Sequence, residues 1–100
     1  MYLEWRQPAA EKAIRLVRES KSRKENFTVQ QYLYATVYHR KDNGAPITIE
    51  GWQAQAASQT FLVSFSYTDA SGQHLATWEA NLTESKVTPQ NQEAKELSWQ

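Results

Sequence analysis

Two alternating stretches, separated by a short polar turn, constrain the fold of this chain more than any other feature. In Thr60–Thr68 every second residue is apolar, and the same alternation recurs in His74–Leu82 with the exception of Leu75. A period of two places apolar side chains on one face of a strand and polar side chains on the other. Asp69–Gln73, between the stretches, contains an aspartate and a glycine, which are typical of a hairpin loop with a bulge. We therefore predict an antiparallel hairpin with a single buried face.

The length and composition allow one modest core. Of 100 residues, 40% are hydrophobic and 12% aromatic, which predicts a single domain over residues 1–100, expected to be part of a longer protein. No apolar run approaches the ~20 residues that cross a bilayer, and the first residues do not match a secretory signal. The absence of cysteine excludes disulfides, thiolate nucleophiles and cysteine metal sites.

The N-terminal part of the chain predicts an amphipathic helix. Pro8 suits the first turn of a helix, and small or apolar residues then recur every three or four positions as far as Val17. A polar stretch over residues 20–26 ends the pattern and predicts a loop. The narrow, alanine-rich stripe indicates that this helix packs closely against a sheet.

The segment over residues 28–41 is open to two interpretations. Thr28 and Gln31 form a capping-box pattern, and Val29, Leu33 and Val37 form a helical stripe, so we favour a second helix. The same segment is rich in tyrosine and β-branched residues, which favour a strand. The strand alternative would give one helix and four strands.

The flanks of the central hairpin predict a further strand and a terminal helix. In residues 46–57 the alternation changes phase at Gly51, which predicts a β-bulge, and residues 58–59 form a tight turn. Near the C-terminus, Thr88 as cap and Pro89 at the first helical position predict a short helix with Ala94 and Leu97 on one face. The predicted fold is α+β: an N-terminal helix and a second helix on one face of a curved three- to four-stranded antiparallel meander, with a short C-terminal helix.

Charge is distributed unevenly although the formal net charge is +0. Residues 1–24 carry seven basic and three acidic side chains, so this segment has a charge of +4 and the remainder a charge of −4. The candidate anion contacts in it are Lys12, Arg15, Arg18, Lys21, Arg23 and Lys24. Overall neutrality, and the lack of aromatic residues among these cations, favour a solvated helix end, and we expect no nucleic-acid partner.

Catalytic chemistry has few candidate residues. His39 and His74 are the only imidazoles, and neither lies within metal-ligand spacing of another likely ligand. Glu79 falls on the polar side of the hairpin without a second acid to face it. The three glycines are isolated, so there is no phosphate-binding loop. We expect no catalytic residue, metal or cofactor.

Aromatic residues provide the candidate interaction surface. Trp52 and Trp78 have the parity of core residues. Trp5 and Trp99 lie near the ends of the chain, where they either clamp the termini or belong to an interface. Tyr34 and Tyr38 are four residues apart on the outer side of the expected second helix. The candidate surface is therefore Trp5, Tyr34, Tyr38 and Trp99.

Short motifs spread along the chain carry a family resemblance. They are Leu16-Val17, Thr28-Val29, Gly51-Trp52-x-Ala54, Val63-Ser64-Phe65, Trp78-Glu79-Ala80-Asn81-Leu82 and Val87-x-Pro89-x-Asn91. Together they resemble small bacterial domains of the cystatin-like or NTF2-like type that are attached to membrane-anchored or exported proteins. The resemblance implies an extracytoplasmic location and a binding or scaffolding role. It carries over no catalytic residue, and the Gln-x-Val-x-Gly hairpin of cystatin inhibitors is absent.

Three functional hypotheses follow. The first is a non-enzymatic domain that contacts another protein, another domain of its own chain or a second copy in a homodimer. The second is a small-molecule pocket between helix and sheet, with catalysis through His74, Glu79 or Tyr67. The third is anion binding by the basic N-terminal helix.

Overall fold

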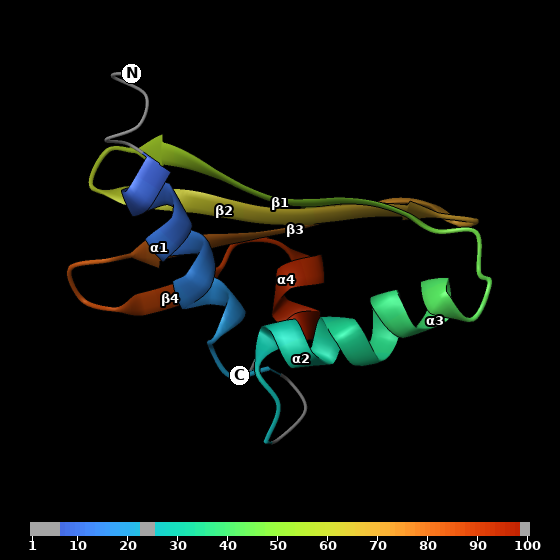
Figure 1. The fold of residues 1–100 in the computed structure, drawn as a ribbon. Coiled ribbons are helices and arrows are strands. Elements are labelled where there is room, and N and C mark those ends of the chain that lie inside the picture. The colour runs from blue at the N-terminus through green and yellow to red at the C-terminus, as the bar shows by residue number, and fades with distance from the viewer. Residues whose placement is uncertain (1–6, 23–25, 99–100) are drawn as a thin grey trace.

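Four antiparallel strands form one sheet in the order β1-β2-β3-β4 (Figure 1). The structure is a computed structural model, and it describes residues 7–22 and 26–98. The strands are β1 (Thr48–Ala57), β2 (Thr60–Asp69), β3 (Gly72–Asn81) and β4 (Lys86–Pro89). The helices are α1 (Gln7–Arg18), α2 (Val29–Leu33), the π-helical turn η1 (Tyr34–Tyr38), α3 (His39–Asp42) and α4 (Gln92–Leu97).

The central hairpin is confirmed as β2 and β3. Val63 pairs with Trp78 and Phe65 with Ala76, so the apolar sides of both strands share one face. The predicted bulged loop is wrong. Asp69 pairs directly with Gly72 and the register between the strands is continuous, so no extra residue is inserted beside the turn. Gly72, the first residue of β3, has a φ of 122°, which glycine adopts readily.

The helical interpretation of residues 28–41 is confirmed. Thr28 and Gln31 form the predicted capping box, in which each side chain bonds to the backbone of the other residue. α2, η1 and α3 follow one another as one helical segment, and the His39 N–H donates to the Tyr34 carbonyl across the wide turn. This turn changes the helical phase, and Tyr38 consequently packs on the core instead of lying fully on the outer side.

The bulge in β1 is confirmed. The pairing register with β2 shifts between Ile49 and Gly51, where Gly51 has a φ of 96°. Both Ile49 and Trp52 therefore face the core. Ala56 lies on the same face near the end of the strand but is exposed.

The predicted start of the C-terminal helix is wrong. Thr88 and Pro89 belong to β4, which pairs with β3 through Ala80–Val87 and Trp78–Pro89. Pro89 is tolerated there because β4 is an edge strand. The helix begins after Asn91, whose side chain accepts from the Ala94 N–H as the N-cap.

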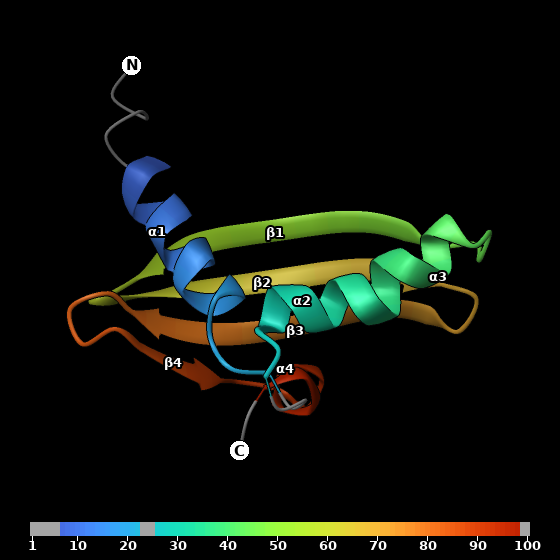
Figure 2. The same cartoon turned by 60° about the horizontal axis from the view of Figure 1, so that its bottom comes forward.

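All helices of the described residues lie on the same face of the sheet, and none of them covers the opposite face (Figures 1 and 2). The largest fully buried apolar side chains between the layers are Trp78, Phe65, Leu33, Val17, Val29 and Val63. α1 crosses one end of the sheet, whereas the segment α2–η1–α3 runs below the other end (Figure 2). The molecule is therefore a two-layer α+β domain, and its described residues include no helix that combines the length and the apolar character needed to span a membrane.

Candidate functional site

Two hollows lie between the helical layer and the sheet. The first, here called the inner pocket, is an open cavity of about 210 Å³ between the segment α2–η1–α3, α4 and the sheet. Its lining combines apolar side chains with polar and charged ones from both layers: Tyr32, Leu33, Thr36, Val37, Arg40, Phe65, Tyr67, His74, Ala76, Glu93, Glu96 and Leu97. The second hypothesis placed Tyr67, His74 and Glu79 around such a cavity. Tyr67 and His74 line it, whereas Glu79 accepts a hydrogen bond from Thr60 elsewhere.

His74 is held between two carboxylates on different elements. Its Nε2 lies 3.1 Å from Asp69 Oδ1 at the β2–β3 turn, and its Nδ1 lies 3.1 Å from Glu93 Oε1 on α4. The Tyr67 ring stacks on the imidazole with 4.6 Å between ring centroids. Arg40 Nη2 approaches Asp69 Oδ2 at 3.8 Å from α3. We call Asp69, His74 and Glu93 the histidine clamp.

Hydrogen bonds within and beside the clamp shift the pKa values of His74 and Asp69. Hydrogen bonding to Glu93, and then to Asp69, raises the pKa of His74 above 6.5. The hydrogen bond from the Ser71 hydroxyl is the largest cause that lowers the pKa of Asp69 from 3.8 to about 2. Burial raises the pKa of Tyr67 above 10.0, so this residue stays a neutral phenol. The raised pKa of His74 means that, below pH 6.5, the protonated imidazolium is the favoured form between its two carboxylate neighbours.

Ser71, His74 and Glu93 resemble a nucleophile, a base and an orienting acid in their connectivity, but the hydrogen bonds are arranged differently. The Ser71 hydroxyl lies 3.0 Å from His74 Nε2 and also donates to Asp69 Oδ1 at 2.7 Å. The Ser71 hydroxyl therefore donates its hydrogen bond to Asp69, and each imidazole nitrogen lies beside a carboxylate. This geometry suits a clamp that ties the hairpin turn to α4.

The second hollow, here called the aromatic slot, has a volume of about 160 Å³. It is lined by Arg18, Gln30, Leu33, Tyr34, Tyr38 and Trp52. Arg18 Nε donates to Gln30 Oε1 at 2.8 Å, and Gln30 Nε2 donates to the Tyr34 hydroxyl at 3.2 Å. These bonds join the last turn of α1 to α2 and η1 across the slot.

Aromatic rings form the walls of the slot. The rings of Tyr34 and Tyr38 meet edge to face with centroids 4.8 Å apart. Trp52, from β1, packs on Phe65 with centroids 5.0 Å apart and is only half-buried. Burial raises the pKa of Tyr38, which remains a neutral hydrogen-bonding phenol.

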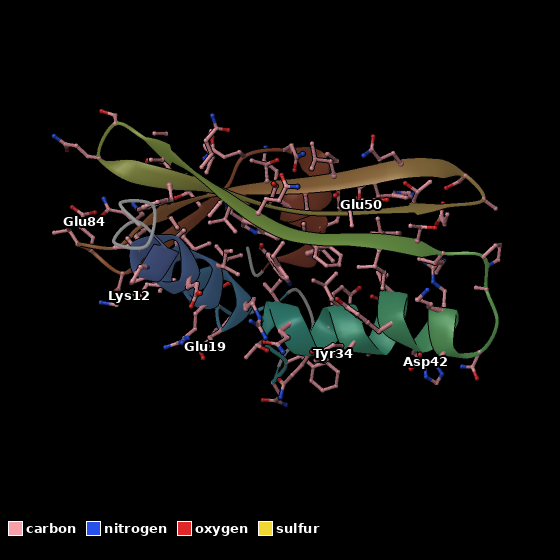
Figure 3. The ribbon with its side chains drawn as sticks, turned by 45° about the horizontal axis from the view of Figure 1, so that its top comes forward. Lys12, Glu19, Tyr34, Asp42, Glu50 and Glu84 are labelled. Atoms are coloured by element: carbon pink, nitrogen blue, oxygen red, sulfur yellow. The ribbon has the colours of Figure 1, made fainter. Side chains whose placement is uncertain are left out.

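The structure brings together part of the predicted interaction surface. Tyr34 is 49% exposed and points away from the sheet (Figure 3), and Tyr38 lies beside it but is half-buried. Trp5 and Trp99 lie outside the described residues. Trp52, expected in the core, contributes to the slot because β1 is an edge strand.

The predicted anion contacts do not converge on one site. Lys12, Arg15 and Lys21 are exposed, whereas Arg18 is half-buried and lines the slot. Figure 3 shows a basic side chain, Lys12, and an acidic one, Glu19, on the helical layer. Arg23 and Lys24 lie outside the described residues. The described cations therefore present a mixed surface with one cation, Arg18, built into a hollow.

Sequence reasoning missed the charged residues of the inner pocket. Arg40, Glu93 and Glu96 were not singled out, since their proximity depends on how α3 and α4 pack. The one signal in the sequence was the hairpin turn, which brings His74 near Asp69, but it does not indicate Arg40, Glu93 or Glu96. Within residues 7–22 and 26–98, no group of three or more His, Asp or Glu side chains is arranged to hold a metal ion.

Comparison of this chain with protein-family models, with curated proteins and with solved structures finds no match in any of the three.

Proposed function

We propose that this chain is a protein-interaction domain that binds an extended, acidic segment of a partner along the free edge of β1, with one partner side chain inserted in the aromatic slot. The observation that carries this proposal is the position of the slot, which is walled by Trp52 of the edge strand itself. The proposed mode is strand addition, in which main-chain hydrogen bonds supply affinity and a side-chain pocket supplies specificity.

The composition of β1 supports strand addition. β1 is ten residues long and pairs on one side only, with β2. From Gly51 to Ala57 it has no proline and no charged residue, although prolines and charged residues commonly protect edge strands. Figure 2 shows the middle of β1 between α1 and α3 without a helix over it. An incoming strand would therefore find unpaired backbone groups over several residues.

The slot supports an apolar or aromatic anchor in the partner. Tyr34 is among the most exposed large hydrophobic side chains of the described residues, and its contacts with Tyr38 and Gln30 already orient it. Rigid, half-exposed aromatic side chains around a hollow are typical of interaction hot spots. Because these rings are held in place before binding, little conformational entropy is lost when a partner side chain enters.

Charge favours an acidic partner over a second copy of the chain. Arg18 lines the slot, and on and just beyond α1 the exposed cations Lys12, Arg15 and Lys21 outnumber the exposed acids Glu11 and Glu19. Two copies joined at β1 around a two-fold axis would bring these cations toward each other, which is unfavourable. An extended partner with carboxylates beside its anchor residue would instead be attracted.

The fold and location form part of the same proposal. Helices on one face of a four-stranded meander support a cystatin-like or NTF2-like architecture, and the sequence motifs that resemble such bacterial domains are the basis for an extracytoplasmic location. A partner domain within the same longer chain would satisfy the interaction equally well.

The test uses a synthetic peptide in which glutamate alternates with valine and one central tyrosine, titrated against the isotope-labelled protein and followed by NMR. We expect binding that weakens as salt is raised, with shift changes in β1 and at Tyr34. A peptide with lysine in place of glutamate tests charge, and one methylated on alternate backbone nitrogens tests strand addition. Equal binding of the three peptides would contradict the proposal, as would dimerisation of the free protein through β1.

Matched variants locate the site. Tyr34→Ala removes a slot wall, and we expect it to weaken peptide binding roughly ten-fold or more. Leu75→Ala is the control, because Leu75 is 47% exposed but belongs to β3, outside the residues that line the slot. The same loss of binding in both variants would show that the peptide binds without using the slot.

A further inference from the structure

We propose that the inner pocket is a second binding site, separate from the aromatic slot, and that it binds a small primary ammonium compound with an apolar body. Leu33 is the only residue that lines both hollows. The inner pocket lies between the segment α2–η1–α3 and α4, so a ligand in it need not touch the β1 edge.

The bottom of the pocket suits an apolar body. It is lined by Leu33, Val37, Phe65 and Ala76, which are all buried. These side chains form an apolar surface contributed by the helical segment and by the two central strands. The cavity of about 210 Å³ is smaller than the roughly 300 to 1,000 Å³ typical of drug-sized ligands. A ligand about the size of one aromatic ring with a short side chain therefore fits.

The charges of the pocket select a cation. The imidazolium of His74 is paired with Asp69 and Glu93, and the Arg40 guanidinium faces Asp69. Glu96 accepts a hydrogen bond from the Gln92 amide at 3.3 Å but has no ion pair with any described residue. The charged residues that line the pocket are two cations, Arg40 and His74, and two carboxylates, Glu93 and Glu96. Asp69, just outside the lining, pairs with both cations, so the wider group has three carboxylates against two cations and Glu96 is the carboxylate without an ion pair to a described residue.

The remaining polar groups of the lining favour an ammonium donor. An ionised carboxylate accepts hydrogen bonds only, and a tyrosine hydroxyl can accept one. Glu93, Glu96 and Tyr32, which all line the pocket, therefore carry oxygen atoms that can accept a hydrogen bond from a ligand. A primary ammonium group carries three donors and no acceptor, so it matches this set, whereas a carboxylate ligand would meet like charge.

The test compares three probes of similar size: 2-phenylethylamine, 2-phenylethanol and 3-phenylpropanoate. Each is titrated at pH 6 against the isotope-labelled protein, and binding is followed by NMR shift changes. We expect the amine to bind at millimolar concentration, with changes at Glu96, Leu97 and Tyr32, and to bind at least about five-fold more tightly than the alcohol. The carboxylate is expected not to bind.

Two variants make the test decisive. Glu96→Gln keeps the size of an exposed side chain and should weaken amine binding roughly five- to ten-fold, while alcohol binding stays unchanged. Glu84→Gln, at the exposed β3–β4 turn, is the matched control (Figure 3). Equal binding of amine and alcohol, no binding of the amine, shift changes outside the pocket, or the same effect in both variants would each overturn the inference.

Discussion

At the scale of single residues, Trp78 has the largest structural role. Its side chain has 0% exposure, it packs against Trp52, and its indole Nε1 donates to Ser98 Oγ at 2.7 Å. Trp78→Ala leaves a large cavity, and we expect it to lower the free energy of unfolding by about 3 to 5 kcal/mol. Urea unfolding measures this loss, and a value below about 1 kcal/mol would show that the indole is not packed as described.

Ser98 provides a separate test of the same contact. Ser98→Ala removes the acceptor and leaves the indole N–H without a partner, which should cost about 1 to 3 kcal/mol. In a Trp78→Phe background the same serine change should cost much less, because no indole N–H remains. Additive losses from the two changes would show that the hydrogen bond contributes no stability of its own.

The histidine clamp predicts a pH dependence of stability. His74 has a raised pKa in the folded chain, so its contribution is complete below 6.5 and is lost as pH rises through the folded value. Asp69 has its pKa lowered to about 2, so its contribution is complete above 3.8 and is lost as pH falls toward 2. The clamp should therefore stabilise the fold most between these limits.

Urea unfolding of the wild type and of His74→Gln from pH 3 to pH 9 measures this effect. We expect the difference between the two proteins to be largest near pH 5 to 6 and to shrink above neutrality. His39→Gln, at the exposed start of α3, is the control for a general effect of losing a histidine. A His74→Gln difference that stays constant with pH would contradict the clamp.

Sequence reasoning found single residues where local pattern decides their environment. The parity of Trp78 on β3 was sufficient to predict its burial. His74 was taken as an isolated imidazole, because Glu93 is 19 residues away and reaches it only through the packing of α4. Such long-range partners leave no spacing pattern in the sequence.

At the scale of elements, Asn91 connects β3 to α4. Its Oδ1 accepts from the Thr77 and Ala94 N–H groups, and its Nδ2 donates to the Leu75 carbonyl at 2.8 Å. The side chain thus continues the pairing of β3 where β4 ends and also caps the helix.

Asn91→Ala should therefore cost about 2 to 3 kcal/mol, more than the roughly 1 kcal/mol of a helix cap alone. Asn91→Asp keeps the acceptor oxygens but loses the donor to Leu75, and it should have an intermediate effect. Urea unfolding measures both. Equal stability of the alanine and aspartate variants would indicate that the cap and the Thr77 bond are not important.

The bulge in β1 makes a second prediction for an element. Gly51 has a φ of 96°, and a β-carbon added there would meet no atom within 4 Å. Gly51→Ala should therefore cost about 1 to 2 kcal/mol from backbone conformation alone. Gly51→Asn, which tolerates positive φ better, should cost less in the same thermal or urea measurement. Identical losses would imply that the bulge relaxes on substitution.

Element prediction succeeded where signals agreed and failed where they competed. The capping box of Thr28 and Gln31 outweighed the strand propensity of the tyrosines, and the helix formed. Thr88 and Pro89 have an equally good helix-start pattern, but pairing of Val87 with Ala80 places them in a strand. Sequence reasoning did not consider Asn91, which caps the helix, as its start.

At the scale of the whole molecule, the sheet has two inner and two outer strands. β2 and β3 pair on both sides, whereas β1 and β4 each pair on one side. Amide hydrogen exchange should therefore be slowest around Val63–Phe65 and Ala76–Ala80, and faster in β1 and β4. NMR-detected exchange checks this order. Protection of β1 equal to that of β2 in the free protein would indicate that its edge is already paired with a second copy.

The general architecture followed from the sequence, but the sites followed only in part. One-sided alternation in β2 and β3 predicted the sheet with helices on one face. Tyr34 and Arg18 were singled out separately, yet their position on either side of one slot depends on how α1 and α2 cross. A hollow forms where packed helices and strands leave space between them. Its position therefore depends on how the elements pack and not on the sequence of any one element.

The sheet face without helical cover has a consequence for mutational tolerance. On that face Ser64, Ser66 and Thr77 alternate with the buried side chains of the same strands. In a saturation library of β2 and β3 selected for folding, the number of tolerated amino acids should therefore alternate along each strand. Positions on the uncovered face should accept nearly any residue, and positions on the core face should accept few. This half of the surface is accordingly the place where new properties could be introduced without disturbing the core or either hollow.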